Sequence, residues 1–348
     1  MKETKELIYK LSAMMSVTGY EWRAKDELFA AVGEYFDECY EHTTGTFVLV
    51  KKCGRENASR LMLDAHFDEI GMVVSEIHDG GYLSIARLGG LDRRILPATE
   101  VKIYGSETIY GVICSTPPHL QGADDYKKTP ELDDILIDTG YSKEELEKIV
   151  RIGTPIGFYE GTAELIGDKL CGRSMDNKAC AASAVRAAMM LDKKDMVCDL
   201  YVTLSSREEE SLAGGCVNAA YSICPDAAIV TDVTFATFPG VEKYESGKMG
   251  EGVVISLSAV TDRRLTEALI AKCEAEEIPF VRTVDATDTG TNATMLALTG
   301  DGIPTAVVSV PLSNMHTYNE IIDARDVLSA AKLFAAAACD EKTFGGAK

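Results

Sequence analysis

The stretch Asp64-Ala65-His66-Phe67-Asp68-Glu69-Ile70-Gly71 directly follows Arg60-Leu61-Met62-Leu63, an apolar run that predicts a buried strand. Side chains alternate along a strand with a period of two, so His66 and Asp68 should point to the same side of the chain. A metal-binding histidine often has a carboxylate partner that fixes its tautomer. His66 is therefore a candidate metal ligand and Asp68 its orienting partner. The alternative is a structural histidine beside a surface carboxylate.

The composition predicts a soluble globular protein with room for one large domain or two smaller ones, since 46% of its 348 residues are hydrophobic and 26% are charged. We find no apolar run long enough to span a membrane and no signal peptide, so we expect no membrane partner. With 35 Lys and Arg against 55 Asp and Glu, the net charge of −20 disfavours nucleic acid as a partner. The 10 cysteines include no CxxC pair, which favours free thiols in the cytoplasm.

The pattern of predicted elements divides the chain into two kinds of structure. Strands alternate with helices at both ends of the chain, which predicts an α/β fold with a mostly parallel sheet sandwiched by helices. Between these ends, short strand-like runs such as Glu100-Val101-Lys102-Ile103-Tyr104 are separated by Gly-rich turns, which predict a small β-rich unit. We expect a discontinuous α/β domain of residues 1–69 and 165–348, interrupted by an inserted domain of residues 70–164.

Three acidic residues lie where predicted strands end or a helix begins. Asp176 precedes the helix expected over residues 177–191, where a helix-capping role is the alternative. Glu208 and Glu209 follow the apolar strand predicted at residues 200–204, and the alternative is a solvated acidic loop. Ligands of doubly wound sheets bind beyond the carboxyl ends of strands. One glutamate of such a pair can bind a metal while the other transfers protons.

Asp232 and His316 also follow apolar strands, although each alone could be a turn, cap or structural residue. Together with the residues above they form a set of nitrogen and carboxylate ligands that suits zinc, cobalt or manganese. The candidate metal ligands are His66, Asp176, one glutamate of the pair Glu208 and Glu209, Asp232 and His316.

Over nearly its whole length, the sequence resembles the M42 metallo-aminopeptidases, which include glutamyl and deblocking aminopeptidases and the tetrahedral (TET) peptidases. The specific feature is the order His-x-Asp, Asp, Glu-Glu, Asp, His along the chain. The segments that carry the resemblance are Val17-Thr18-Gly19-Tyr20-Glu21, residues 64–71, Gly89-Gly90-Leu91-Asp92, Gly172-Arg173-Ser174-Met175-Asp176-Asn177, Glu208-Glu209, Gly290-Thr291-Asn292 and His316.

The resemblance implies two divalent metal ions per subunit, either zinc, cobalt or manganese. Asp176 would bridge the two ions. His66 and Asp232 would complete the ligands of one ion, and Glu209 and His316 those of the other.

The resemblance also implies the reaction, which is removal of N-terminal residues from short peptides. Glu208 would be the general base that activates a metal-bridging water, and Asp68 would support His66. The implied fold is a phosphorylase/hydrolase-like metallopeptidase domain with an inserted, β-barrel-like dimerisation domain. Members commonly form homo-oligomers in which dimers assemble into a dodecamer. A cis peptide bond is implied between Asp176 and Asn177.

The sequence departs from the family pattern at three places that are not proposed ligands or the base. Glu210-Ser211 stand where a small apolar residue and Gly are usual, Ser313-Asn314 where an Arg-Tyr pair is frequent, and Asn292 where an acid is frequent. The preferred N-terminal residue, the native metal and the choice between dimer and dodecamer therefore stay open. Two other functions also stay open: a metal-dependent hydrolase of other amides, such as acyl-amino acids or blocked peptides, and a catalytically impaired metal-binding homologue.

Overall fold

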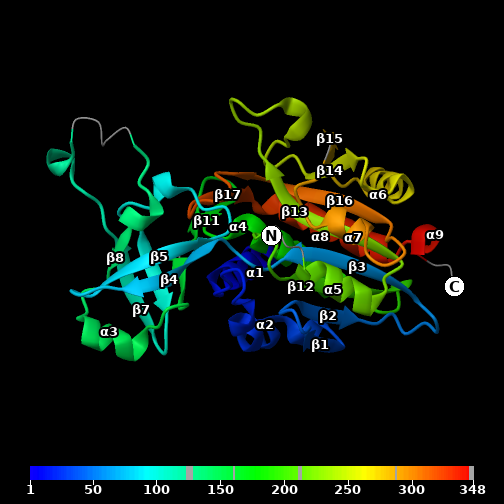
Figure 1. The fold of residues 1–348 in the computed structure, drawn as a ribbon. Helices are drawn as coiled ribbons and strands as arrows, with labels where there is room; N and C mark the ends of the chain where they lie inside the picture. Colours follow the sequence, from blue (N-terminus) through cyan, green and yellow to red (C-terminus); the bar gives the residue numbers. More distant parts are fainter. Residues whose placement is uncertain (123–127, 160, 211–213, 287, 345–348) are drawn as a thin grey trace.

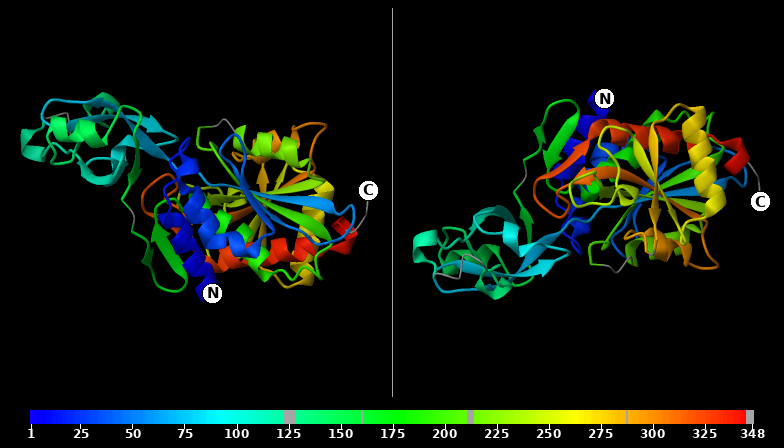
Figure 2. Two further views of the ribbon diagram at one scale, coloured as in Figure 1. Left: turned by 90° about the horizontal axis from the view of Figure 1, so that it is seen from below. Right: turned by 90° about the horizontal axis from the view of Figure 1, so that it is seen from above.

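The computed structural model describes residues 1–122, 128–159, 161–210, 214–286 and 288–344. Ser211, one of the departures noted above, lies outside the described residues. The chain forms a large α/β body and a smaller barrel that projects from one end of it (Figures 1 and 2). Both the class and the barrel agree with the predicted fold.

The α/β body is built on an 11-stranded sheet. The strands are β1 Glu38–Glu41, β2 Phe47–Lys51, β3 Ser59–His66, β10 Ala163–Glu164, β11 Lys169–Gly172, β12 Cys198–Ser205, β13 Ala227–Phe235, β14 Val253–Ser258, β15 Phe280–Asp285, β16 Thr305–Ser313 and β17 Glu320–Asp323. Their order is β1-β2-β12-β3-β13-β16-β17-β11-β10, while β14 pairs with both β15 and β16.

The sheet is mixed, and the expected mostly parallel arrangement holds only for part of it. The central strands β12, β3, β13 and β16 are parallel to one another, as are the outer strands β14 and β15, whereas β2 is antiparallel to β12 and β14 to β16. The outer pairs β1–β2, β10–β11 and β16–β17 are antiparallel. The physical reason is that these pairs are joined by short links, whereas a parallel pair needs a longer crossover.

Helices cover both faces of the sheet (Figure 2). The helices are α1 Lys2–Ala13, α2 Lys25–Val32, α4 Met175–Met190, α5 Gly214–Ile223, α6 Arg263–Ala275, α7 Ala293–Ala297, α8 Ala324–Ala338 and α9 Glu341–Phe344. One face packs mainly against α1, α4 and α8, and the other against α5 and α7. Strand β3 shows the division, because Leu61 and Leu63 join the first core and Met62 the second. Among the described residues, no helix has the length and apolar character needed to cross a membrane.

The projecting unit is a closed barrel of six strands with a core of its own. Its elements are β4 Gly71–Ile77, β5 Tyr82–Leu88, β6 Glu100–Tyr104, β7 Thr108–Ile113, β8 Leu136–Asp138, helix α3 Lys143–Ile149 and β9 Pro155–Phe158. Val101, Ile103 and Ile137 are fully buried inside it. A capping box begins α3, since the Ser142 side chain accepts a hydrogen bond from the backbone of Glu145. The predicted limits of the inserted domain, 70–164, stay a proposal, and β10 at their end pairs with the large sheet.

Gly71 is the last residue of the stretch 64–71 and the first residue of barrel strand β4. The α/β body and the barrel therefore meet at this residue. A Cβ atom at this position would lie 2.9 Å from the carbonyl oxygen of Ile156 and 2.9 Å from Cγ1 of Val17. Neither neighbour has free space to move into, because both residues are fully buried. Only glycine therefore fits where the barrel joins the sheet.

Replacing Gly71 with alanine should lower the free energy of unfolding by about 1–3 kcal/mol, the usual cost of overpacking a buried site. Urea denaturation monitored by circular dichroism measures this change. Gly161→Ala is a matched control, because a Cβ atom there would have no neighbour within 4 Å. Equal stability of the two variants would show that the junction is not tightly packed.

Candidate metal centre

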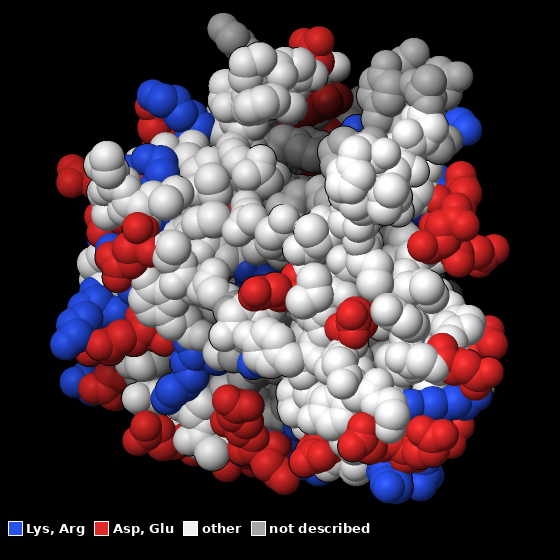
Figure 3. Space-filling model, turned by 90° about the vertical axis from the view of Figure 1, so that its left-hand side faces the viewer, with Lys and Arg blue, Asp and Glu red and all other residues white. Residues whose placement is uncertain are grey.

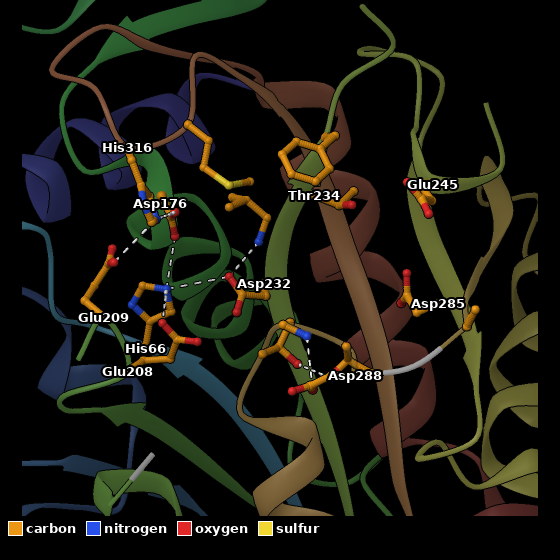
Figure 4. A pocket seen from close by; sticks show the side chains of 17 residues that line it. His66, Asp176, Glu208, Glu209, Asp232, Thr234, Glu245, Asp285, Asp288 and His316 are labelled. Carbon is orange, nitrogen blue, oxygen red and sulfur yellow. Dashed lines mark hydrogen bonds and ion pairs between the residues drawn. The ribbon is translucent and has the colours of Figure 1, made fainter. Parts of the chain in front are cut away.

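The predicted ligands gather at the carboxyl ends of the central strands, as Figure 4 shows. His66 is the last residue of β3 and pairs with Ser205, the last residue of β12. Glu208 and Glu209 lie in the turn that follows β12, and Asp232 lies in β13 beside β3. Because neighbouring parallel strands end at one edge of the sheet, residues far apart in the sequence meet there.

Asp176 lies at the beginning of α4, but it does not cap this helix. The N-cap residue is Ser174, and both Asp176 and Asn177 have non-helical backbone angles. The peptide bond between them is cis, as the resemblance implies. The Asp176 carboxylate is buried and faces the two histidines of the centre instead of the first turn of the helix.

The two oxygens of Asp176 face different histidines. Oδ1 lies 3.0 Å from Nε2 of His66, and Oδ2 lies 3.4 Å from Nε2 of His316. Each Nε2 atom also has a second aspartate or glutamate nearby: Asp232 Oδ1 lies 3.6 Å from His66 Nε2, and Glu209 Oε2 lies 3.4 Å from His316 Nε2. The site therefore consists of two histidine–carboxylate pairs that share Asp176.

The hydrogen bonds of the histidine rings are compatible with a cation between these groups. His66 Nδ1 lies 3.1 Å from the carbonyl oxygen of Asp68, and His316 Nδ1 lies 3.2 Å from that of Gly90. A carbonyl oxygen can only accept a hydrogen bond, so each Nδ1 carries the proton of a neutral ring. The Nε2 lone pairs then point at carboxylate oxygens, which is favourable only if the ring is protonated or a cation lies between them.

The spacing of the ligand atoms also fits a metal ion. One ligand atom from each of His66, Asp176 and Glu209 lies within 4.8 Å of the others. Nitrogen and carboxylate oxygen atoms are the usual ligands of zinc. The donor set present therefore fits a divalent metal.

The carboxylates of the centre have abnormal pKa values because they are buried together. Burial raises the pKa of Glu208 to about 8, with Asp232 adding to the effect. Burial and the nearby Asp176 also raise the pKa of Glu209 well above its usual value. For His66, burial alone would lower the pKa, but Asp232 and Glu208 raise it. A bound cation would offset this repulsion and favour the ionised carboxylates.

Asp68 contacts His66 differently from the expectation. Its backbone carbonyl lies closer to His66 Nδ1 than its carboxylate does, since the carboxylate oxygen Oδ1 is 3.6 Å away. The carboxylate mainly accepts hydrogen bonds from the backbone N–H groups of Glu208 and Glu209, at 3.1 and 3.0 Å. Asp68 therefore holds the turn that carries both glutamates as well as the histidine.

Sequence reasoning missed Glu320, a fully buried residue at the start of β17. Its two carboxylate oxygens accept hydrogen bonds from the backbone N–H groups of Asp176 and His316, at 3.0 and 2.9 Å. The Glu320 side chain thus connects the backbone of Asp176 to the backbone of His316. The only sequence signal is its position four residues after His316.

A buried network of charged side chains packs against the stretch 64–71. Lys178 donates hydrogen bonds to the carbonyl oxygen of Phe67 at 2.7 Å and to the Ser16 hydroxyl at 2.6 Å. Its ammonium group also lies 3.1 Å from the centroid of the Phe67 ring, and burial lowers its pKa to about 7. Arg173 and Glu69 form a buried ion pair beside it. These contacts keep Phe67, between His66 and Asp68, in a fixed position.

The departures from the family pattern do not insert a side chain between the candidate ligands. Asn292 donates hydrogen bonds to Asp64 at 2.8 Å and to Ser205 at 2.9 Å. Glu210 accepts one from the backbone of Gly89, and Asn314 donates one to the carbonyl oxygen of Asn319. Asn292, Glu210 and Asn314 thus pair with neighbouring polar groups.

Comparison with known proteins supports one family. The model of the M42 glutamyl aminopeptidases matches residues 45–333. A lysyl aminopeptidase of Pyrococcus furiosus is 30% identical over 94% of each chain. The structure resembles an aminopeptidase from Desulfurococcus kamchatkensis with a TM-score of 0.89 and 30% identity, covering 97% of this chain and 95% of that one. It also resembles the Pyrococcus horikoshii TET1 peptidase with a TM-score of 0.85 and 25% identity, covering 96% of this chain and 99% of that one. The TET1 peptidase can assemble into a tetrahedron or a large octahedral shell.

These matches confirm the resemblance inferred from the motifs and the assignment of the chain as a hydrolase of the exopeptidase class. The match extends across both the α/β body and the barrel, so it does not depend on one motif. This chain belongs to the M42 glutamyl aminopeptidase family.

Proposed function

We propose that this protein is a metal-dependent aminopeptidase that removes N-terminal residues from short peptides at a centre of two divalent ions. The observation that carries this proposal is the position of Asp176, whose two oxygens face two separate histidine–carboxylate pairs. A single ion would need only one such pair. A carboxylate shared between two pairs is the arrangement expected of a bridging ligand.

His66 and Asp232 would hold one ion, Glu209 and His316 the other, and Asp176 both. These nitrogen and carboxylate ligands suit zinc, cobalt or manganese. When bound, the ions would polarise the scissile carbonyl and lower the pKa of the attacking water.

Glu208 is suited to be the general base, because it is an acid of the centre that is not needed as a ligand. Its carboxylate lies 3.9 Å from Nε2 of His66 and lines the cavity, which has a volume of about 490 Å³. In this role it takes the proton of the attacking water and returns it to the leaving amine. The hydrogen bond from its backbone to Asp68 keeps the side chain beside the ligands.

We also propose that the barrel surface forms contacts between subunits of a homo-oligomer. The face that carries the barrel is largely uncharged at its centre, with acidic and basic side chains around the edge (Figure 3). Exposed apolar residues of the barrel and its loops include Tyr110, Val112, Ile152 and Tyr159. Assembly of the similar TET1 peptidase into closed shells supports self-association of this chain. The 10 free cysteines support a reducing, cytoplasmic location.

Replacing Glu208 with glutamine should lower kcat by about 10²–10⁴-fold, because the amide cannot take a proton from the water. The variant should keep the metal content of the wild type, since Glu208 is not a proposed ligand. Hydrolysis of aminoacyl substrates and elemental analysis of the same sample measure the two quantities. A fully active variant would contradict the role of Glu208.

Addition of zinc, cobalt or manganese to the chelator-treated protein should raise Tm, because the ions bind only the folded state. At 100 times Kd the gain is about 2.7 kcal/mol. Asp176→Asn should lose most of this rise, since it weakens both ion sites, whereas the exposed control Asp301→Asn should keep it. Differential scanning calorimetry with and without metal tests this. An unchanged Tm in the wild type would exclude the proposed centre.

Truncation of Glu320 should weaken metal binding although this residue contacts no ion. Glu320→Ala leaves the buried N–H groups of Asp176 and His316 without an acceptor, and loss of such outer partners typically costs about 10–100-fold in metal affinity. Glu320→Gln keeps one oxygen acceptor and should lose less. Competition with a metal indicator measures both affinities. Equal affinities in Glu320→Ala and the wild type would show that Glu320 has no positioning role.

A further inference from the structure

The cavity beside the proposed metal centre has a second acidic wall that the proposed mechanism does not use. Asp285 ends strand β15, and Glu245 ends a short 3₁₀ helix, Lys243–Glu245, that packs near this strand. Both side chains line the same cavity as the candidate ligands. Figure 4 shows them across the cavity from the ligand group, with strand β13 between.

The acids of this wall have no cationic partner in the described part of the chain. None of the described residues that line the cavity is a lysine or an arginine. Asp285 is half-buried; burial raises its pKa, the Ser256 hydroxyl lowers it, and the nearby carboxylate of Glu245 raises it. A third acid, Asp288, accepts a hydrogen bond from Thr294 of α7 at 2.6 Å. Asp285 is half-buried and Glu245 is exposed, so both carboxylates are accessible to a ligand.

The cavity that holds both acidic regions is also lined by apolar side chains. They include Val233, Phe235 and Met315. Lysine and arginine side chains bury their aliphatic stems on apolar surface and keep the charged group at a polar end. A cavity lined by apolar side chains and two acids therefore complements these two side chains, whereas an acidic side chain would meet like charge.

We propose that Asp285 and Glu245 select substrates whose N-terminal residue is lysine or arginine. This inference rests on the proposed aminopeptidase function, because a peptide whose first carbonyl lies at the metal centre must direct its first side chain along the cavity. The stem would pack against the apolar side chains, and the ammonium or guanidinium group would reach the two acids. N-terminal glutamate or aspartate would be rejected by repulsion.

The test compares kcat/KM for lysyl, arginyl, leucyl and glutamyl p-nitroanilides, using the metal-loaded full-length protein. The wild type should prefer lysyl and arginyl substrates over leucyl by at least ~10-fold and over glutamyl by more. Asp285→Asn and Glu245→Gln should each lower the lysyl-to-leucyl ratio by roughly 3–10-fold. The preference should also fall as the salt concentration rises, because salt screens the attraction.

Glu242→Gln is the matched control, since Glu242 is an exposed acid of the same segment that does not line the cavity. It should keep the wild-type ratio. Glu245→Lys should instead shift the preference towards the glutamyl substrate. The two single variants lie on different segments, so if Asp285→Asn does not fold, Glu245→Gln decides the question.

The outcomes separate this inference from the function on which it rests. A wild type that hydrolyses leucyl or glutamyl substrates as well as basic ones would overturn the selectivity and leave the aminopeptidase function standing. Unchanged ratios in Asp285→Asn and Glu245→Gln would overturn the role of these two acids. A protein that cleaves none of the four substrates with any of the three metals would overturn both proposals.

Discussion

The mutual repulsion of buried carboxylates is the constraint on which the site depends. Glu208, Glu209, Asp176 and Asp232 share one end of a cavity, and in a low-dielectric space such charges strongly disfavour one another. The Nε2 lone pairs of two histidines point at the same carboxylates when the rings are neutral. Divalent cations offset both effects, so the charge pattern itself argues for a metal centre before any relative is considered.

The fold holds these groups in place through backbone contacts as well as side chains. Asp68 accepts hydrogen bonds from the turn that carries Glu208 and Glu209, while Glu320 connects the backbones of Asp176 and His316. Each of these acids joins segments that lie far apart in the sequence. The proposed ligands are therefore positioned by the central sheet and by a small number of buried carboxylates.

Much of the fold and of the ligand set could be predicted from local patterns. The short strands after Gly71 predicted the barrel, because strand periodicity and turn residues are local properties. His66 and Asp232 were recognisable because they lie on or directly after apolar strands. The sheet was only partly predicted, since apolar runs show that strands are buried but not which neighbours they pair with. The limits of the inserted domain and the role of each site residue stay predictions.

The sequence by itself determined the family and the set of residues proposed as ligands and base, because these depend on residue type and on order along the chain. Only the tertiary structure decided which histidine lies beside which carboxylate, that Glu320 connects two of the ligands, and that Asp285 and Glu245 face the centre across one cavity. The physical reason is that the distance between side chains depends on strand order and loop paths. These place residues separated by more than 100 positions, such as His66 and Asp176, within 3.0 Å.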